Sequence, residues 1–200
     1  MKATYKGFEA KKNTGFLELP PAGAYVAEIK EVRLVPADGD KRQRDVIEMM
    51  IEITEGEYAG RYMEYYNTQK EQFGDNVKYK GVFRLTAPLE NDEDWRKRNF
   101  EGNLWCVEQS NPGYTWDWDE KKLKGKKVGI NVRNRLYTYN DKEKSTTEIG
   151  KFETVADVKN GKCKPMADRD QREDNSNLFN NPSTDGSSFT DVSKSVSVPW

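Results

Sequence analysis

In residues 45–54, DVIEMMIEIT, the residue types alternate with a period of two more regularly than in any other stretch of the chain. A period of two residues is typical of a β-strand with one buried face. The residues that point to one side of such a strand are Asp45, Ile47, Met49, Ile51 and Ile53. The stretch therefore predicts a strand whose isoleucine and methionine side chains enter a core.

Two further strands flank this one in the sequence. Residues 24–35, AYVAEIKEVRLV, predict the first strand, and the Pro- and Gly-containing run 36–40 ends it. The basic run 41–44 then leads into the central strand. After a turn at residues 55–60, the tyrosine-rich residues 61–68 predict a third strand, and residues 69–94 receive no assignment.

A helix and two more strands are expected in the second half. Residues 95–109, WRKRNFEGNLWCVEQ, predict a helix that ends at Asn111-Pro112-Gly113. Residues 128–139 and 146–155 predict a fourth and a fifth strand, and residues 156–160 one helical turn. The helix residues expected to be buried are Trp95, Leu104, Trp105 and Cys106.

This order, three strands, a helix and two strands, predicts a mainly β fold. It matches the five-stranded OB-fold barrel with its helix between strands 3 and 4. A different small barrel or an α+β sheet would give the same order. We assign this domain to residues 1–160, because residues 161–200 have the polar composition of a disordered C-terminal tail.

The residue types that are missing exclude several classes of protein. The 200-residue chain has no histidine and two cysteines, so Ser-His-Asp catalysis and His-ligated metal sites are excluded. It also lacks a glycine-rich phosphate loop. We predict a protein that is not an enzyme, has no cofactor and no metal site, and is located in the cytoplasm without a membrane segment.

The fourth predicted strand carries a candidate binding face. Its core-facing residues are Val128, Ile130, Val132 and Leu136. Its other face presents Asn131, Arg133, Arg135, Tyr137 and Tyr139. Arginines that meet phosphates beside rings that stack on bases suit single-stranded nucleic acid. The alternative is an ordinary solvated strand, which Arg and Tyr also cover well.

Other basic and aromatic residues fall where an OB fold holds its ligand, across strands 2 and 3 and between two of its loops. Lys41, Arg42 and Arg44 lie in the first of these loops. Arg61 belongs to the predicted third strand, where either Tyr62 and Tyr66 or Met63 and Tyr65 face outward. The net charge of −1 means that binding would depend on locally segregated charge.

Several short motifs occur in an order that is similar to one known family. These motifs are Tyr5-Lys6-Gly7-Phe8-Glu9-Ala10, Leu19-Pro20-Pro21-Ala22-Gly23-Ala24-Tyr25, Glu55-Gly56-Glu57-Tyr58-Ala59-Gly60-Arg61, Ser110-Asn111-Pro112-Gly113-Tyr114 and Leu123-Lys124-Gly125-Lys126. Over roughly residues 1–160 the chain resembles the OB-fold single-stranded DNA-binding proteins of replication modules in phages of Gram-positive bacteria. The resemblance implies the fold and the ligand class, and it assigns no site residue.

The tail resembles that of bacterial single-stranded DNA-binding proteins, whose acidic tips recruit replication and repair enzymes. Here the chain ends in Val198-Pro199-Trp200 with Lys194 nearby, which differs from an acidic tip ending in Pro-Phe. A tryptophan at the end of a polar tail is exposed unless something binds it, so Pro199 and Trp200 are candidates for contact with replication or recombination proteins. The alternative is an accidental terminus, or one that docks on its own domain.

The leading hypothesis is a non-catalytic, sequence-tolerant single-stranded DNA-binding protein of phage replication or recombination. A protein-interaction module that engages a host or replication protein is the second hypothesis, since near-neutral charge and exposed aromatic residues fit it equally well. A third, a metal-dependent nuclease, would need Asp92, Glu93 and Asp94 to hold Mg²⁺. We interpret that triplet as a solvated loop.

Overall fold

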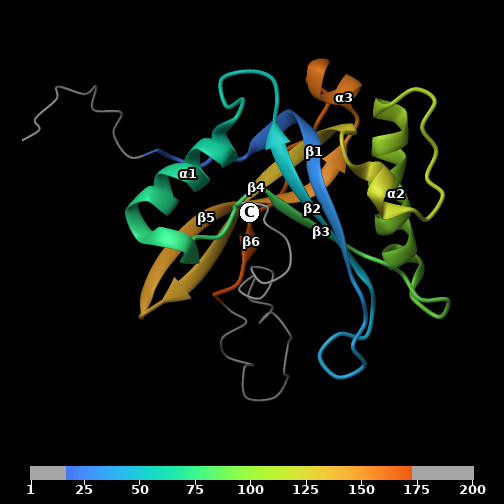
Figure 1. Ribbon diagram of the computed structural model, residues 1–200, viewed down its shortest axis with the longest axis horizontal. Coiled ribbons are helices and arrows are strands. Elements are labelled where there is room, and N and C mark those ends of the chain that lie inside the picture. The colour runs from blue at the N-terminus through green and yellow to red at the C-terminus, as the bar shows by residue number, and fades with distance from the viewer. Residues whose placement is uncertain (1–16, 173–200) are drawn as a thin grey trace, which may run out of the picture.

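The computed structural model describes residues 17–172, which form a mainly antiparallel sheet with two longer helices beside it (Figure 1). The strand order is β3-β2-β1-β4-β5, and a short β6 pairs parallel with β4. The strands are β1 (Gly23–Val35), β2 (Val46–Ile53), β3 (Val82–Thr86), β4 (Lys127–Tyr139), β5 (Lys142–Glu153) and β6 (Arg169–Asp170). The helices are α1 (Arg61–Phe73), α2 (Asp94–Ser110) and α3 (Val155–Lys159), with 3₁₀ turns at η1 (Gly74–Asn76) and η2 (Glu120–Leu123).

The central strand prediction is confirmed. β2 pairs with β1 on one side and with β3 on the other, both antiparallel. Ile47, Met49, Ile51 and Ile53 are all buried, as the alternation requires. The first strand is also confirmed, because β1 covers the predicted residues 24–35.

The sheet is not closed. Within the described residues, β3 and β5 are the two ends of the strand order, and no ladder of hydrogen bonds joins them. Their side chains nevertheless meet in the core, where the rings of Phe83 and Phe152 have centroids 4.4 Å apart. The sheet therefore curves around one hydrophobic core without the edge-to-edge pairing of a complete barrel.

The predicted third strand at residues 61–68 is wrong, because these residues begin helix α1. Gly60 takes a left-handed φ of 74° and turns the chain, and Tyr62 and Tyr66 then enter the core from one side of the helix. Glu52 of β2 accepts hydrogen bonds from the backbone N–H groups of Tyr62 (3.1 Å) and Met63 (2.7 Å). A carboxylate from the sheet thus satisfies the N-terminus of a helix that has no side-chain cap of its own.

The actual third strand, β3, lies in the stretch that the sequence left unassigned. It pairs Leu85 with Ile47 and Phe83 with Met49. Gly81, just before it, lies so close to β2 that an added Cβ would be 2.4 Å from the carbonyl oxygen of Ile51. The strand count before α2 is therefore three as predicted, with a different segment as the third member.

The helix predicted at 95–109 is confirmed as α2, but two of its expected core residues are not buried. The helix side chains that are buried against the rest of the domain include Phe100, Leu104, Cys106 and Val107. Trp95 and Trp105, which we expected to be buried, are 51% and 52% exposed. Gly102 is accommodated within the helix and has open space around it.

The last predicted elements are confirmed with changed limits. β4 covers the predicted fourth strand, β5 begins at Lys142 rather than at 146, and α3 corresponds to the predicted helical turn. Residues 161–172, which composition assigned to the tail, lie against the sheet: Asn131 donates a hydrogen bond to the carbonyl oxygen of Lys164 (2.9 Å). The remainder of the predicted tail, with Pro199 and Trp200, lies outside the described residues.

Candidate nucleic-acid interface

The hairpin of β4 and β5 presents the predicted arginine and tyrosine residues on one face. Its two-residue turn, Asn140-Asp141, has positive φ angles of 50° and 58°, as in the tight turns that join twisted strands. Directly opposed residues of an antiparallel pair lie on the same face. The pairs on this face, which we call the hairpin face, are Arg133 with Glu148, Arg135 with Thr146, Tyr137 with Lys144, and Tyr139 with Lys142.

The outer half of the hairpin extends beyond the core. Val132 and Ile149, which oppose each other, are 1% and 6% exposed, and the paired residues nearer the turn are half-buried or exposed. In Figure 1 the tip of the hairpin (yellow and orange) points away from α2. The hairpin face is therefore accessible along its outer half.

Glu148 stands at the centre of a group of three arginines. Arg133 donates to it from Nε (3.0 Å), with Nη2 2.9 Å away. The guanidinium groups of Arg135 and Arg169 lie 3.9 Å and 3.7 Å from its other oxygen. Arg169 is brought there by β6, in which it pairs with Arg135 across the backbone. Three positive charges around one carboxylate leave a local excess of positive charge.

Two lysines extend this charge. Lys142 and Lys144 lie on the hairpin face opposite the two tyrosines. The pKa of Lys80 is lowered by desolvation and then by the positive charges of Arg135 and Lys78. The chain is close to neutral as a whole, but basic residues from three separate segments gather here.

The tyrosine rings of the hairpin face lie beside cationic groups. The guanidinium of Arg135 is 5.6 Å from the ring centroid of Tyr137, and the ammonium of Lys144 is 5.1 Å from that of Tyr139. Tyr139 is 57% exposed. The arrangement offers a planar ring and a positive charge at neighbouring positions, which are the two groups that bind unpaired nucleotides.

The basic loop between β1 and β2 is occupied by contacts of its own. Arg42 donates to the carbonyl oxygen of Pro36 (2.9 Å), and Asp38 accepts hydrogen bonds from the backbone N–H groups of Lys41 and Arg42. Arg44 forms an ion pair with Asp92, and its hydrogen bond lowers the pKa of that carboxyl to about 2. Figure 1 shows this loop (blue) well separated from the hairpin tip, so the structure does not bring Lys41, Arg42 and Arg44 to the hairpin face.

The candidate residues of α1 lie elsewhere as well. Tyr62 and Tyr66 are 2% and 6% exposed and pack against the ring of Tyr79, so they present no ring to a ligand. Burial raises the pKa of Tyr62. Arg61 forms an ion pair with Glu64 (3.4 Å) and lies over the ring of Tyr58. The other pair that the sequence offered as outward-facing, Met63 and Tyr65, is partly exposed.

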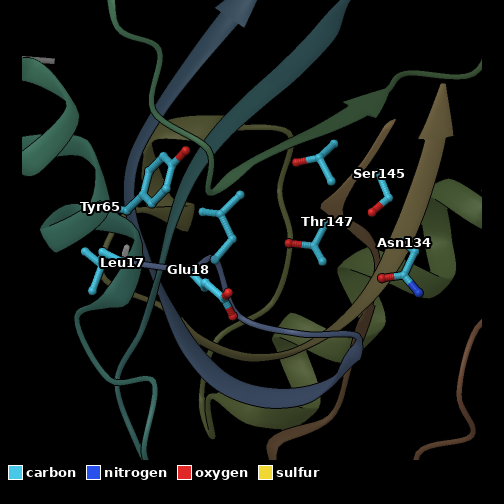
Figure 2. A pocket seen from close by; sticks show the side chains of 8 residues that line it. Leu17, Glu18, Tyr65, Asn134, Ser145 and Thr147 are labelled. Atoms are coloured by element: carbon cyan, nitrogen blue, oxygen red, sulfur yellow. The ribbon is translucent and has the colours of Figure 1, made fainter. Parts of the chain in front are cut away.

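A groove of about 340 Å³ separates α1 from the other side of the hairpin (Figure 2). Figure 2 shows Leu17, Glu18 and Tyr65 along one wall, and Asn134, Ser145 and Thr147 along the other. The Thr147 hydroxyl is buried and has no hydrogen-bond partner in the described part of the chain. The groove joins three distant segments, so no local pattern could have indicated it.

The described residues contain neither a cluster suited to a metal ion nor a helix suited to a membrane. Among residues 17–172, no three carboxylate or thiol side chains come together in a way that could hold a metal ion. In the Asp92–Asp94 triplet, Asp92 pairs with Arg44 and Glu93 accepts a hydrogen bond from the Trp95 indole. No helix in this range has the length and apolar character needed to cross a bilayer.

Comparison of the sequence with models of known families and with curated proteins yields no match.

Proposed function

We propose that this protein binds single-stranded DNA along the hairpin face, without catalysis and without strong sequence preference. The observation that carries the proposal is the gathering of Arg133, Arg135 and Arg169 around Glu148, next to the rings of Tyr137 and Tyr139. A charged groove that follows the backbone, combined with rings that stack on bases, is the usual means of binding single strands.

The roles of the residues follow from their chemistry. Arginines and lysines of the hairpin face neutralise phosphates, and the release of counterions supplies much of the affinity. Tyr137 and Tyr139 stack on bases, an interaction that tolerates any sequence because every base has a π-face. Arg169 joins this surface from outside the hairpin.

The fold and the sequence resemblance support the same proposal. An antiparallel sheet whose helix α2 lies between β3 and β4 agrees with an OB-fold-like architecture. The motifs shared with single-stranded DNA-binding proteins of phage replication modules favour a role in phage DNA replication or recombination. The partner would be an exposed strand in the bacterial host cytoplasm.

The direct test is fluorescence anisotropy of a labelled oligo-dT titrated with the full-length protein. If about four phosphates are contacted, affinity should fall roughly 50-fold between about 50 and about 200 mM salt. Duplex DNA of the same length should bind much more weakly, because its bases are not open to stacking. Absence of binding at the lower salt concentration would exclude the proposal.

The variant Glu148→Gln is expected to bind single-stranded DNA more tightly than the wild type. It removes the carboxylate that offsets the three arginines. One unit charge about 6 Å from a phosphate in water contributes about 0.7 kcal/mol, or roughly a threefold change in affinity. The change should appear at low salt and shrink as salt increases. It is measured by the same anisotropy titration.

Glu143→Gln is the matched control for this charge change. Glu143 pairs with Thr138 in the ladder, so it lies on the opposite face of the same hairpin, where it forms an ion pair with Arg172 (3.1 Å). Its replacement changes the net charge equally but not the hairpin face. If both variants tighten binding to the same degree, the effect comes from overall charge and the hairpin face is not the site.

A further inference from the structure

Helix α2 carries an exposed stripe on the side away from the body. The stripe, which we call the outer stripe, has members spaced alternately three and four residues apart, and this spacing places them along one side of a helix. Its members are Trp95, Arg98, Gly102, Trp105 and Gln109. All five are exposed, whereas Phe100, Leu104 and Val107 pack against the body from the other side.

Two features of the outer stripe favour a contact outside the single chain, although Arg96 lies 4.5 Å from the centroid of the Trp95 ring and Glu93 accepts a hydrogen bond from its indole. Trp95 and Trp105 leave about half of their surface in water, although tryptophan is a residue that proteins usually cover. Gly102 is unfavourable in a helix interior, and a Cβ added there would meet nothing within 4 Å. A glycine with open space above it, between two exposed tryptophans, permits another helix to approach closely.

We propose that the outer stripe is a dimerisation surface on which α2 pairs antiparallel with α2 of a second copy of this chain. The stripe has two kinds of position: those that precede a three-residue step, such as Trp95 and Gly102, and those that follow one, such as Arg98 and Trp105. When two such helices pack antiparallel, a position of one kind on one helix faces a position of the other kind on its partner. Trp95 of one copy then faces Trp105 of the other at both ends of the contact. In the middle, Arg98 of each copy faces Gly102 of the other, a long side chain against an absent one.

The charges on α2 favour a second copy as the occupant. An isologous contact requires one surface to carry both members of every pair. Glu101 is exposed and adjacent to Gly102 in the sequence, so the Arg98 that crosses Gly102 also reaches Glu101 of the opposite copy, and the two-fold axis makes this ion pair twice.

This proposal does not depend on the proposed DNA-binding function. Figure 1 shows α2 and the tip of the β4–β5 hairpin on opposite sides of the molecule. Pairing through α2 therefore leaves both hairpin faces accessible. A dimer would carry two DNA-binding surfaces pointing away from its centre.

The test is sedimentation of the full-length protein over a wide range of concentrations. We expect the wild type to show a reversible monomer–dimer equilibrium in the micromolar range. Gly102→Leu should remove the dimer, because the new side chain occupies the place of Arg98 from the other copy. The same change improves helix propensity at an exposed site, so the monomer should melt at an unchanged or higher temperature. Loss of association without loss of stability separates an interface effect from misfolding.

Charge reversal gives a second and more specific measurement. Arg98→Glu should abolish the dimer, and combining it with Glu101→Arg should restore it, since the ion pair is rebuilt with opposite signs. Trp118→Ala is the control, because Trp118 is 70% exposed on the loop after α2 and lies outside the outer stripe.

Three outcomes would overturn the proposal. The first is a wild type that remains monomeric at every concentration, and the second is a dimer that survives both Gly102→Leu and Arg98→Glu. In the third, these variants lower the affinity for oligo-dT while the wild type is monomeric. The outer stripe would then be a nucleic-acid surface instead.

Discussion

Replacing Tyr137 and Tyr139 together with alanine is expected to lower the affinity for single-stranded DNA by at least tenfold. Each base stacked on an aromatic ring contributes about 1–3 kcal/mol, and about 1.4 kcal/mol corresponds to a factor of ten. Both rings lie on the hairpin face, and Tyr139 is 57% exposed, so their loss should leave the core intact. The measurement is anisotropy with oligo-dT, together with a thermal melt to verify folding.

Two controls sharpen this experiment. Tyr137→Phe with Tyr139→Phe keeps both rings and should keep most of the affinity. Phe73→Ala removes a ring that is 67% exposed at the end of α1 and is not part of the β4–β5 hairpin, and it should have no effect. If the folded double alanine variant binds as well as the wild type, β4 is not part of the DNA-binding site.

The largest expected effect on stability comes from Glu52→Leu. The Glu52 carboxylate is buried, accepts the N–H groups of Tyr62 and Met63, and lies 2.9 Å from the Tyr79 hydroxyl. Each buried N–H left without an acceptor costs about 1–3 kcal/mol. We expect the free energy of unfolding to fall by roughly 3 kcal/mol, a large part of the about 5–15 kcal/mol typical of a domain. Urea denaturation measures the change.

Glu64→Gln provides the comparison for Glu52. Glu64 also lies in the first turn of α1, but its side chain is 60% exposed and pairs with Arg61 on the surface. Its replacement should change the free energy of unfolding by less than about 0.5 kcal/mol. If Glu52→Leu has an equally small effect, then α1 is held by its packed tyrosines and not by the carboxylate from β2.

The candidate site was predictable where one strand carries its residues and not where several segments meet. Alternation in residues 128–139 placed Arg133, Arg135, Tyr137 and Tyr139 on one face, and the ladder with β5 bears this out. Arg169 could not be assigned to that face, because its position depends on the pairing of β6 with β4. Local periodicity carries no information about which distant segment lies beside a strand.

The misassigned third strand shows a different limit. Residues 61–68 are rich in tyrosine, a residue that favours strands. Tyr62 and Tyr66 are four residues apart, which is the spacing of one helix face, and Glu64 between them contradicts an alternating buried strand. That signal was present in the sequence, but the acceptor that satisfies the helix N-terminus comes from Glu52, on another element.

The sequence by itself determined the alternating strands β2 and β4, the helix predicted at residues 95–109 and the residue types of β4 on the hairpin face, because each depends on periodicity within one segment. Only the tertiary structure decided that Glu48 and Glu52, on the polar side of β2, are buried. Arg33 and Arg84 form ion pairs with Glu48 at 2.5 and 2.6 Å, and the N-terminus of α1 covers Glu52. It also decided that Trp95 and Trp105 face outward. A charge enters a protein interior, and a tryptophan stays in water, according to the neighbours that the fold brings to it.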